Sequence, residues 1–131
     1  MRPLYVLLVY LVAPLVIAHE AWKALFNPAY RGRLGQRLGF VQRAARPGSV
    51  WIHAVSVGEV QAAAGLVSEL QRRYPTLPIV LTTVTPTGSQ RARSLFNEGV
   101  QICYLPYDLP GSVGRFLDRI SPQVVVILET E

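Results

Sequence analysis

Hydrophobic positions in the second part of the chain follow two alternating periods. Four short runs are almost continuously apolar, and they are residues 50–55, 78–83, 100–105 and 124–128. Short apolar runs bounded by turn residues are typical of buried strands. After the first run, apolar residues recur at the spacing i, i+3, i+4, i+7, as Val60, Ala63, Ala64 and Val67. This second period predicts a helix with one apolar face.

Strands that alternate with helices predict an α/β fold with a Rossmann-like parallel sheet, covered by helices on both faces. Two further helices are expected, one ending at residues 97–99 and one over residues 113–120. Ser56 is the candidate N-cap of the first helix, and Thr87 or Ser89 of the second. Each hydroxyl can accept a hydrogen bond from an unpaired N–H group of a first turn.

A different pattern occupies the N-terminus, where residues 3–18 form an uncharged apolar run. The run is slightly shorter than the ~20 residues that cross a bilayer comfortably. It fits a signal peptide, a single spanning helix, or an anchor that enters the membrane without clearly crossing it. A buried helix of a larger protein is the alternative without a membrane. The length of the run and its basic flank favour membrane association.

Charge separates the two parts of the chain. Of the net charge of +5, residues 1–46 hold seven Arg or Lys side chains and one acid, Glu20, whereas residues 47–131 hold six Arg and seven acids. A basic segment can bind nucleic acid or an anionic membrane surface. Aromatic residues such as Trp22 and Tyr30 accompany the cations, so we expect a membrane surface and no nucleic acid. Cations after the apolar run favour the cytoplasmic face.

Several chemistries are excluded or disfavoured by single residues. The one cysteine, Cys103, excludes an internal disulfide and a Cys-based metal cluster. The two histidines lie too far apart for metal-ligand spacing, and we expect neither a metal nor a cofactor. His53 and Ser56 could suggest a nucleophilic triad, but no G-x-S-x-G motif surrounds the serine. We therefore interpret His53 as a packed residue of the first strand.

Glu59 is the leading candidate for chemistry. It stands in the first turn of the predicted helix after the first strand, at the edge where open α/β sheets bind ligands. The positive end of a helix favours the ionised carboxylate, which suits a general base. Ser56 and Gly58 beside it could present backbone N–H groups to a phosphate. A purely helix-stabilising glutamate is the more common role for this position.

Two more polar turns are expected on the same edge. Thr85, Thr87, Gly88 and Ser89 follow the second strand, and Glu129 follows the fourth. Capping and turn formation account for most of these hydroxyls without a ligand. Because the carboxyl ends of parallel strands meet at one edge, we expect these turns to share a rim with residues 56–59. The rim residues other than the two glutamates are candidate substrate-binding positions.

Four motifs carry a resemblance to a known family. They are His-Ala-Val-Ser-Val-Gly-Glu at residues 53–59, Thr-Thr-Val-Thr-Pro-Thr-Gly-Ser at 82–89, Tyr-Leu-Pro-Tyr-Asp-Leu-Pro at 104–110 and Leu-Glu-Thr-Glu at 128–131. In this order, they resemble the 3-deoxy-D-manno-octulosonic acid (Kdo) transferases of lipopolysaccharide synthesis. The resemblance covers nearly the whole chain, including the apolar N-terminus and the region of Tyr30 to Gly39.

The resemblance implies an inverting glycosyltransferase of the GT-B arrangement, acting at the cytoplasmic face of the bacterial inner membrane. Such an enzyme transfers Kdo from CMP-Kdo to a lipid A precursor. The resemblance further implies that Glu59 is the general base and that Glu129 stabilises the transition state. It also implies that the N-terminal domain handles the acceptor, while the CMP-Kdo site lies mostly in a C-terminal domain that this chain lacks. We therefore expect the chain alone to be inactive.

We expect three segments along the chain: a membrane-anchor helix at residues 1–26, a basic juxtamembrane segment and linker at 27–49, and a Rossmann-like acceptor domain at 50–131. Because the chain stops at the lip of its fourth strand, we expect it to be a fragment. Two other functions stay open: a non-enzymatic, membrane-tethered α/β binding module, and a nucleotide-binding domain acting alone.

Overall fold

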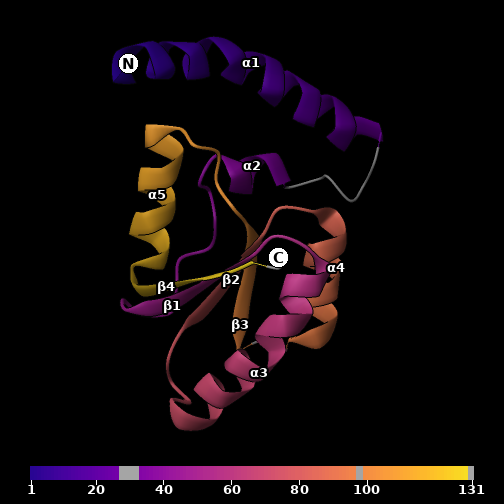
Figure 1. Ribbon diagram of the computed structural model, residues 1–131, viewed down its shortest axis with the longest axis vertical. Coiled ribbons are helices and arrows are strands. Elements are labelled where there is room, and N and C mark those ends of the chain that lie inside the picture. Colours follow the sequence, from indigo (N-terminus) through magenta and orange to yellow (C-terminus); the bar gives the residue numbers. More distant parts are fainter. Residues whose placement is uncertain (27–32, 97–98, 130–131) are drawn as a thin grey trace.

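The computed structural model describes residues 1–26, 33–96 and 99–129 (Figure 1). Its helices are α1 (Arg2–Phe26), α2 (Arg33–Arg37), α3 (Val57–Arg73), α4 (Pro86–Leu95) and α5 (Pro110–Ile120). Its strands are β1 (Ser49–Ala54), β2 (Ile79–Thr83), β3 (Val100–Tyr104) and β4 (Pro122–Leu128). Tyr30 and Arg31, which the sequence assigned to a basic segment near the membrane, lie outside the described residues.

The four strands form one parallel sheet in the order β3-β2-β1-β4. The predicted Rossmann-like α/β fold and the apolar helix before it are therefore confirmed. The chain runs outward from β1 to β3 and then returns to place β4 on the other side of β1. A reversal of this kind makes the carboxyl ends of β1 and β4 a topological switch point, where open α/β sheets bind ligands.

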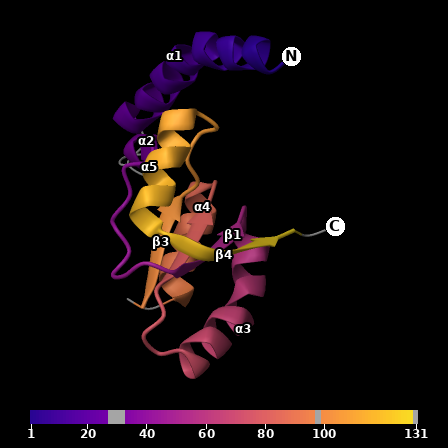
Figure 2. The same ribbon diagram turned by 90° about the vertical axis from the view of Figure 1, so that its left-hand side faces the viewer.

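One face of the sheet packs against α3 and α4 (Figures 1 and 2). Val60, Ala63 and Val67 of α3 are at most 1% exposed, so the predicted apolar stripe is the buried one. They join Ile52 of β1 and Leu81 of β2 in the larger hydrophobic core. Burying apolar surface of this kind is the main driving force for holding helix and sheet together.

The opposite face packs against α5 (Figure 2). The Phe116 ring meets the Trp51 ring edge-on, with 4.9 Å between their centroids. Cys103 is buried in the same core, and burial raises the pKa of its thiol to about 12. The thiol is therefore protonated at neutral pH and acts as an apolar packing group.

Several predicted boundaries were wrong for identifiable reasons. The N-cap of α4 is Thr85, not Thr87 or Ser89, and α5 begins at Pro110 instead of residue 113. Proline fits the first helical position because its φ is preset and its missing N–H would have no partner there. The helix α4 already ends at Leu95. The short helix α2 occupies a segment that the sequence analysis assigned to a juxtamembrane linker.

Cover of the sheet is uneven. The strand β2 is buried along its whole length, whereas Val124, Val125 and Ile127 of β4 are 46–63% exposed. The expectation of two covered faces therefore holds for the sheet centre and fails at β4 within the described residues.

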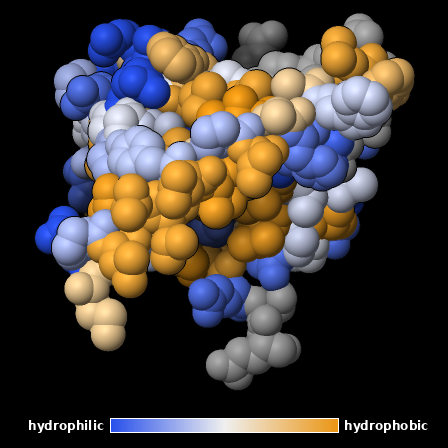
Figure 3. Space-filling view, turned by 90° about the horizontal axis from the view of Figure 1, so that it is seen from above, coloured by the Kyte–Doolittle hydropathy of each residue, from blue (hydrophilic) through white to orange (hydrophobic). Residues whose placement is uncertain are grey.

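The helix α1 lies across one end of the α/β unit and does not project away from it (Figures 1 and 2). Residues Arg2–Lys23 have a mean hydropathy of 1.9, and this is the one helix of the described chain long and apolar enough to cross a membrane. A signal sequence would meet the same criterion. Viewed from above, this end of the molecule presents a broad apolar surface (Figure 3).

Candidate functional site

The turn between β1 and α3 holds Glu59 in a fixed place. Ser56 is the N-cap of α3 in an extended conformation, and Glu59 is the third helical residue. The backbone N–H of Ser56 donates to Glu59 Oε2 across 3.1 Å, and the Ser56 hydroxyl donates to the same oxygen. This reciprocal capping box satisfies donors that the helix start would leave unpaired. The predicted N-cap is thus confirmed, and the carboxylate has a structural task of its own.

Glu59 is only 8% exposed, although it lies at the rim of the sheet. Its carboxylate sits at the positive end of α3, where the helix dipole stabilises a negative charge. Gly58, directly before it, is exposed, and a Cβ added there would meet no atom within 4 Å. The space above the turn is therefore open to a ligand.

The turn between β2 and α4 packs against the first turn. The N–H of Gly88 donates to Thr85 Oγ1 across 3.0 Å, which caps α4. A Cβ on Gly88 would come 2.9 Å from Thr85 Oγ1 and 3.5 Å from the carbonyl oxygen of Val55. Ser89 is 5% exposed, whereas Thr87 is exposed. Thr85, Gly88 and Ser89 therefore build the turn, and Thr87 is its accessible hydroxyl.

Glu129 directly follows β4 and is exposed. Its strand pairs with β1 so that Leu128 lies opposite Ala54. The segments carrying Glu59 and Glu129 thus leave neighbouring strand ends, on either side of the switch point. The turn of residues 85–89 leaves the end of β2, which is the other neighbour of β1. All the rim residues singled out in the sequence therefore follow carboxyl ends of one parallel sheet.

His53 has a structural environment instead of a catalytic one. Its Nδ1 lies 2.9 Å from Thr82 Oγ1, and Trp51 Nε1 donates to the same hydroxyl oxygen across 2.8 Å. Burial lowers the pKa of His53 from 6.5, so its imidazole is neutral at pH 7. The hydroxyl of Ser56 is directed to Glu59 instead of the histidine.

A buried cationic cluster below α1 was missed by the sequence analysis. Arg33 is 8% exposed, forms an ion pair with Glu20 of α1, and donates to the carbonyl oxygen of Val84 across 2.6 Å. It thereby ties α1 to the segment that enters the β2–α4 turn. The sequence analysis expected the basic residues of this segment to contact lipid headgroups at a membrane surface. The available signal was Glu20 itself, the single acid among the seven cations of residues 1–46.

Arg37 is the second member of this cluster. Its guanidinium lies over the Tyr107 ring, 4.2 Å from the centroid. Its Nε and Nη1 and the Tyr107 hydroxyl are buried without hydrogen-bond partners within the described structure. Burial also lowers the pKa of Arg37. Buried polar groups are normally paired, so these atoms are exceptions within the described structure.

Comparison with known proteins identifies the family. Residues 32–131 match the family described as 3-deoxy-D-manno-octulosonic-acid transferase (kdotransferase). The chain belongs to this family. A 3-deoxy-D-manno-octulosonic acid transferase of Haemophilus influenzae is 42% identical over 99% of the chain and 31% of the relative. One from Bordetella pertussis is 41% identical over 82% of the chain and 25% of the relative.

The family extends beyond bacteria. A probable mitochondrial 3-deoxy-D-manno-octulosonic acid transferase of Arabidopsis thaliana is 33% identical over 98% of the chain and 29% of the relative. The chain thus spans less than a third of each Kdo transferase relative named here. No solved structure matches it significantly. Among the described residues, no group of three or more His, Cys, Asp and Glu side chains is placed to hold a metal ion.

Proposed function

We propose that this chain is the acceptor-binding part of an inverting Kdo transferase, which transfers Kdo from CMP-Kdo to a lipid A precursor. The observation that carries the proposal is the placement of Glu59. Its carboxylate is oriented by Ser56 at a helix N-terminus, below open space at Gly58 and next to a topological switch point. A base at such a rim can meet an acceptor hydroxyl that approaches from outside the sheet.

In the proposed reaction, Glu59 takes the proton of the acceptor hydroxyl as its oxygen attacks the anomeric carbon of Kdo. A new glycosidic C–O bond forms on one side of that carbon. The bond to the phosphate oxygen of CMP breaks on the other side, and CMP leaves with the electron pair. Glu129 is proposed to stabilise the positive charge that develops on the sugar. Both glutamates leave adjacent strand ends, which supports a shared site.

The surrounding rim residues divide into two proposed roles. Gly58 and Thr87 are exposed and are proposed to contact substrate. The remaining candidates, Thr85, Gly88 and Ser89, are proposed to act by shaping the turn that supports the β1–α3 turn. Ser56 orients the base through its two hydrogen bonds to Glu59.

The proposed arrangement along the chain keeps the three segments at residues 1–26, 27–49 and 50–131. We propose that α1 anchors the protein at the cytoplasmic face of the inner membrane and lies along the bilayer surface. Two contacts at opposite ends of α1 support this orientation, from Tyr5 to Asp108 and from Glu20 to Arg33. A donor domain for CMP-Kdo is proposed to belong to the longer protein.

The complete enzyme, supplied with CMP-Kdo and lipid A precursor in vesicles, tests the proposal. We expect transfer with inversion of the anomeric configuration, which NMR of the product would reveal. Retention of configuration would contradict the role given to Glu59. Binding of the lipid without transfer would instead support a membrane-tethered binding module.

A further inference from the structure

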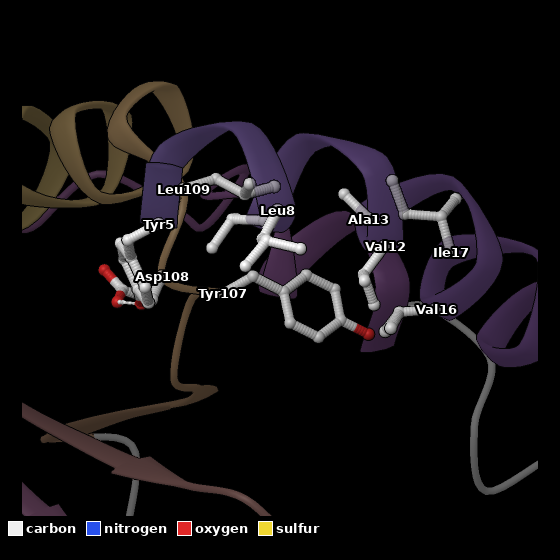
Figure 4. Close-up of a pocket in the computed structure, with 10 residues that line it drawn as sticks. Tyr5, Leu8, Val12, Ala13, Val16, Ile17, Tyr107, Asp108 and Leu109 are labelled. Atoms are coloured by element: carbon white, nitrogen blue, oxygen red, sulfur yellow. Dashed lines mark hydrogen bonds between the residues drawn. The ribbon is translucent and has the colours of Figure 1, made fainter. Parts of the chain in front are cut away.

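The helix α1 has two distinct long faces. Val9, Ala13 and Ile17 are half-buried at the spacing i, i+4, i+8, and the fully buried Glu20 follows on the same side. Leu11, on the other side, is 63% exposed. Leu8, Val12 and Val16 point toward Tyr107 of the α/β unit (Figure 4), while the side of Leu11 is available to the membrane. Only part of the inward face is in close contact with protein.

Between its two tethers, α1 leaves a groove above the loop that follows β3. Near the start of α1, the Tyr5 hydroxyl donates to Asp108 Oδ2 across 2.5 Å, and near its end Glu20 pairs with Arg33. The groove has a volume of about 410 Å³ and is walled by Leu8, Val12 and Val16 of α1 and by residues 107–109 (Figure 4). Its walls are almost entirely apolar.

Besides the Tyr5–Asp108 pair at one end, the Tyr107 side chain brings a polar group to the groove. The Tyr107 hydroxyl points between Val12 and Val16 and has no hydrogen-bond partner within the described structure (Figure 4). Arg37 lies over the ring of the same tyrosine and does not line the groove. A ligand with a long apolar part would match the walls, and an oxygen atom beside Tyr107 would offer its hydroxyl the partner it lacks within the described structure.

We infer that this groove binds an acyl chain of the lipid acceptor, with the polar linkage of that chain beside Tyr107. The inference rests on the proposed function. The groove lies beside the outer face of α1, which a bilayer would contact, and its floor leaves β3 at the rim that carries Glu59.

Seating one chain in this groove would fix the distance between the membrane and the rim. The acceptor sugar would then reach Glu59 while its remaining chains stay in the bilayer. The groove would act as a specificity site for acylated acceptors, because an ordinary phospholipid lacks the sugar that the rim holds in place.

Photo-crosslinking in the complete enzyme, reconstituted in nanodiscs, tests this inference. One probe is a lipid A precursor with a diazirine near the end of an acyl chain, and the other is a phospholipid with the same labelled chain. We expect the acceptor probe to label Val12, Val16 or Tyr107, and the phospholipid probe to label the outer face at Leu11. Equal labelling of both faces by both probes would overturn the inference, as would a groove labelled mainly by phospholipid.

Ala13→Trp and Leu11→Trp form a matched pair of variants. Trp at position 13 should fill the groove, abolish groove labelling by the acceptor probe and raise KM for acylated acceptor about tenfold, which corresponds to a loss of about 1.4 kcal/mol of binding free energy. Trp at position 11 should leave the groove label in place. Turnover of a deacylated acceptor should be retained in Ala13→Trp, which shows that the enzyme is folded.

Unchanged groove labelling and unchanged KM in Ala13→Trp would reject the acyl site. If the wild-type enzyme then still transferred Kdo with inversion, the proposed function would stand without it. Failure of wild-type transfer would instead count against the proposed function itself.

Discussion

The β1–α3 and β2–α4 turns have the same arrangement of strand, N-cap and helix, but they differ in the residue at a key position. Each joins a parallel strand to a helix through a hydroxyl N-cap, Ser56 in one and Thr85 in the other. At the third helical position, the first turn has Glu59 and the second has Gly88. In the first turn the cap is also tied to a carboxylate, whereas in the second the cap accepts from the backbone N–H of Gly88.

The difference separates an open turn, which carries the proposed base, from a closed one. The second turn is closed, because a Cβ on Gly88 would come within 2.9 Å of its own cap. The first is open, because a Cβ on Gly58 would meet nothing within 4 Å. A close-packed support holds the neighbouring turn in position, while the open turn exposes space to a substrate. Substitutions in the two turns should therefore affect different properties.

The largest expected effect is on turnover in Glu59→Gln. The substitution keeps the size of the side chain and removes its basicity, so the proposed general base is lost. Turnover of the complete enzyme should fall by about 10²–10⁴-fold, the usual contribution of general base catalysis. Transfer rate and melting temperature should be measured together.

Glu69→Gln is the control for this experiment. Glu69 lies on the same helix and pairs with Arg72 and Arg73 at the surface, so its substitution should leave turnover near normal. A folded Glu59→Gln enzyme with near-normal turnover would limit Glu59 to its capping role. Glu129 would then be the next carboxylate to test.

Gly88→Ala should cause the largest loss of stability in the supporting turn. The new methyl group would displace Thr85 Oγ1 and weaken the cap of α4. We expect the free energy of unfolding to fall by about 1–3 kcal/mol, as for other overpacked sites. Denaturant unfolding of the protein measures this change. Unchanged stability would mean that the turn accommodates the methyl group without disturbing the Thr85 cap.

The two N-caps offer a smaller and more selective comparison. Thr85→Ala and Ser56→Ala should each cost about 1 kcal/mol of stability, the typical value for a lost cap. Only Ser56→Ala should also lower turnover, since the Ser56 hydroxyl donates to the carboxylate of Glu59. Both variants should be assayed at temperatures at which they are fully folded. Equal turnover in the two variants would contradict an orienting role for Ser56.

The sequence predicted the α/β fold well because hydrophobic period and strand length are local signals. Ser56 as a cap followed from the residue type and its place before an apolar stripe. Placement of α1 across the domain was not predictable, because it depends on the long-range contacts of Glu20 with Arg33 and of Tyr5 with Asp108. The local pattern around Gly88 could not show that it would be enclosed by a neighbouring turn.

Gly58→Ala is the smallest expected change in stability and the sharpest test of the open turn. Gly58 is helical and exposed, and the added methyl group would meet no protein atom within 4 Å. Alanine should therefore stabilise the protein by about 0.5–1 kcal/mol, the helix preference of Ala over Gly. In Gly88→Ala, the same substitution should have the opposite sign.

Activity of Gly58→Ala then reports on the space above Glu59. If the acceptor approaches the backbone at this turn, the methyl group occupies part of its path, and KM for the acceptor should rise although the protein is more stable. A more stable enzyme with unchanged KM and turnover would show that the substrate does not pass over Gly58. Only the opposite effects of one methyl group on stability and on acceptor use would identify this open turn as a binding surface.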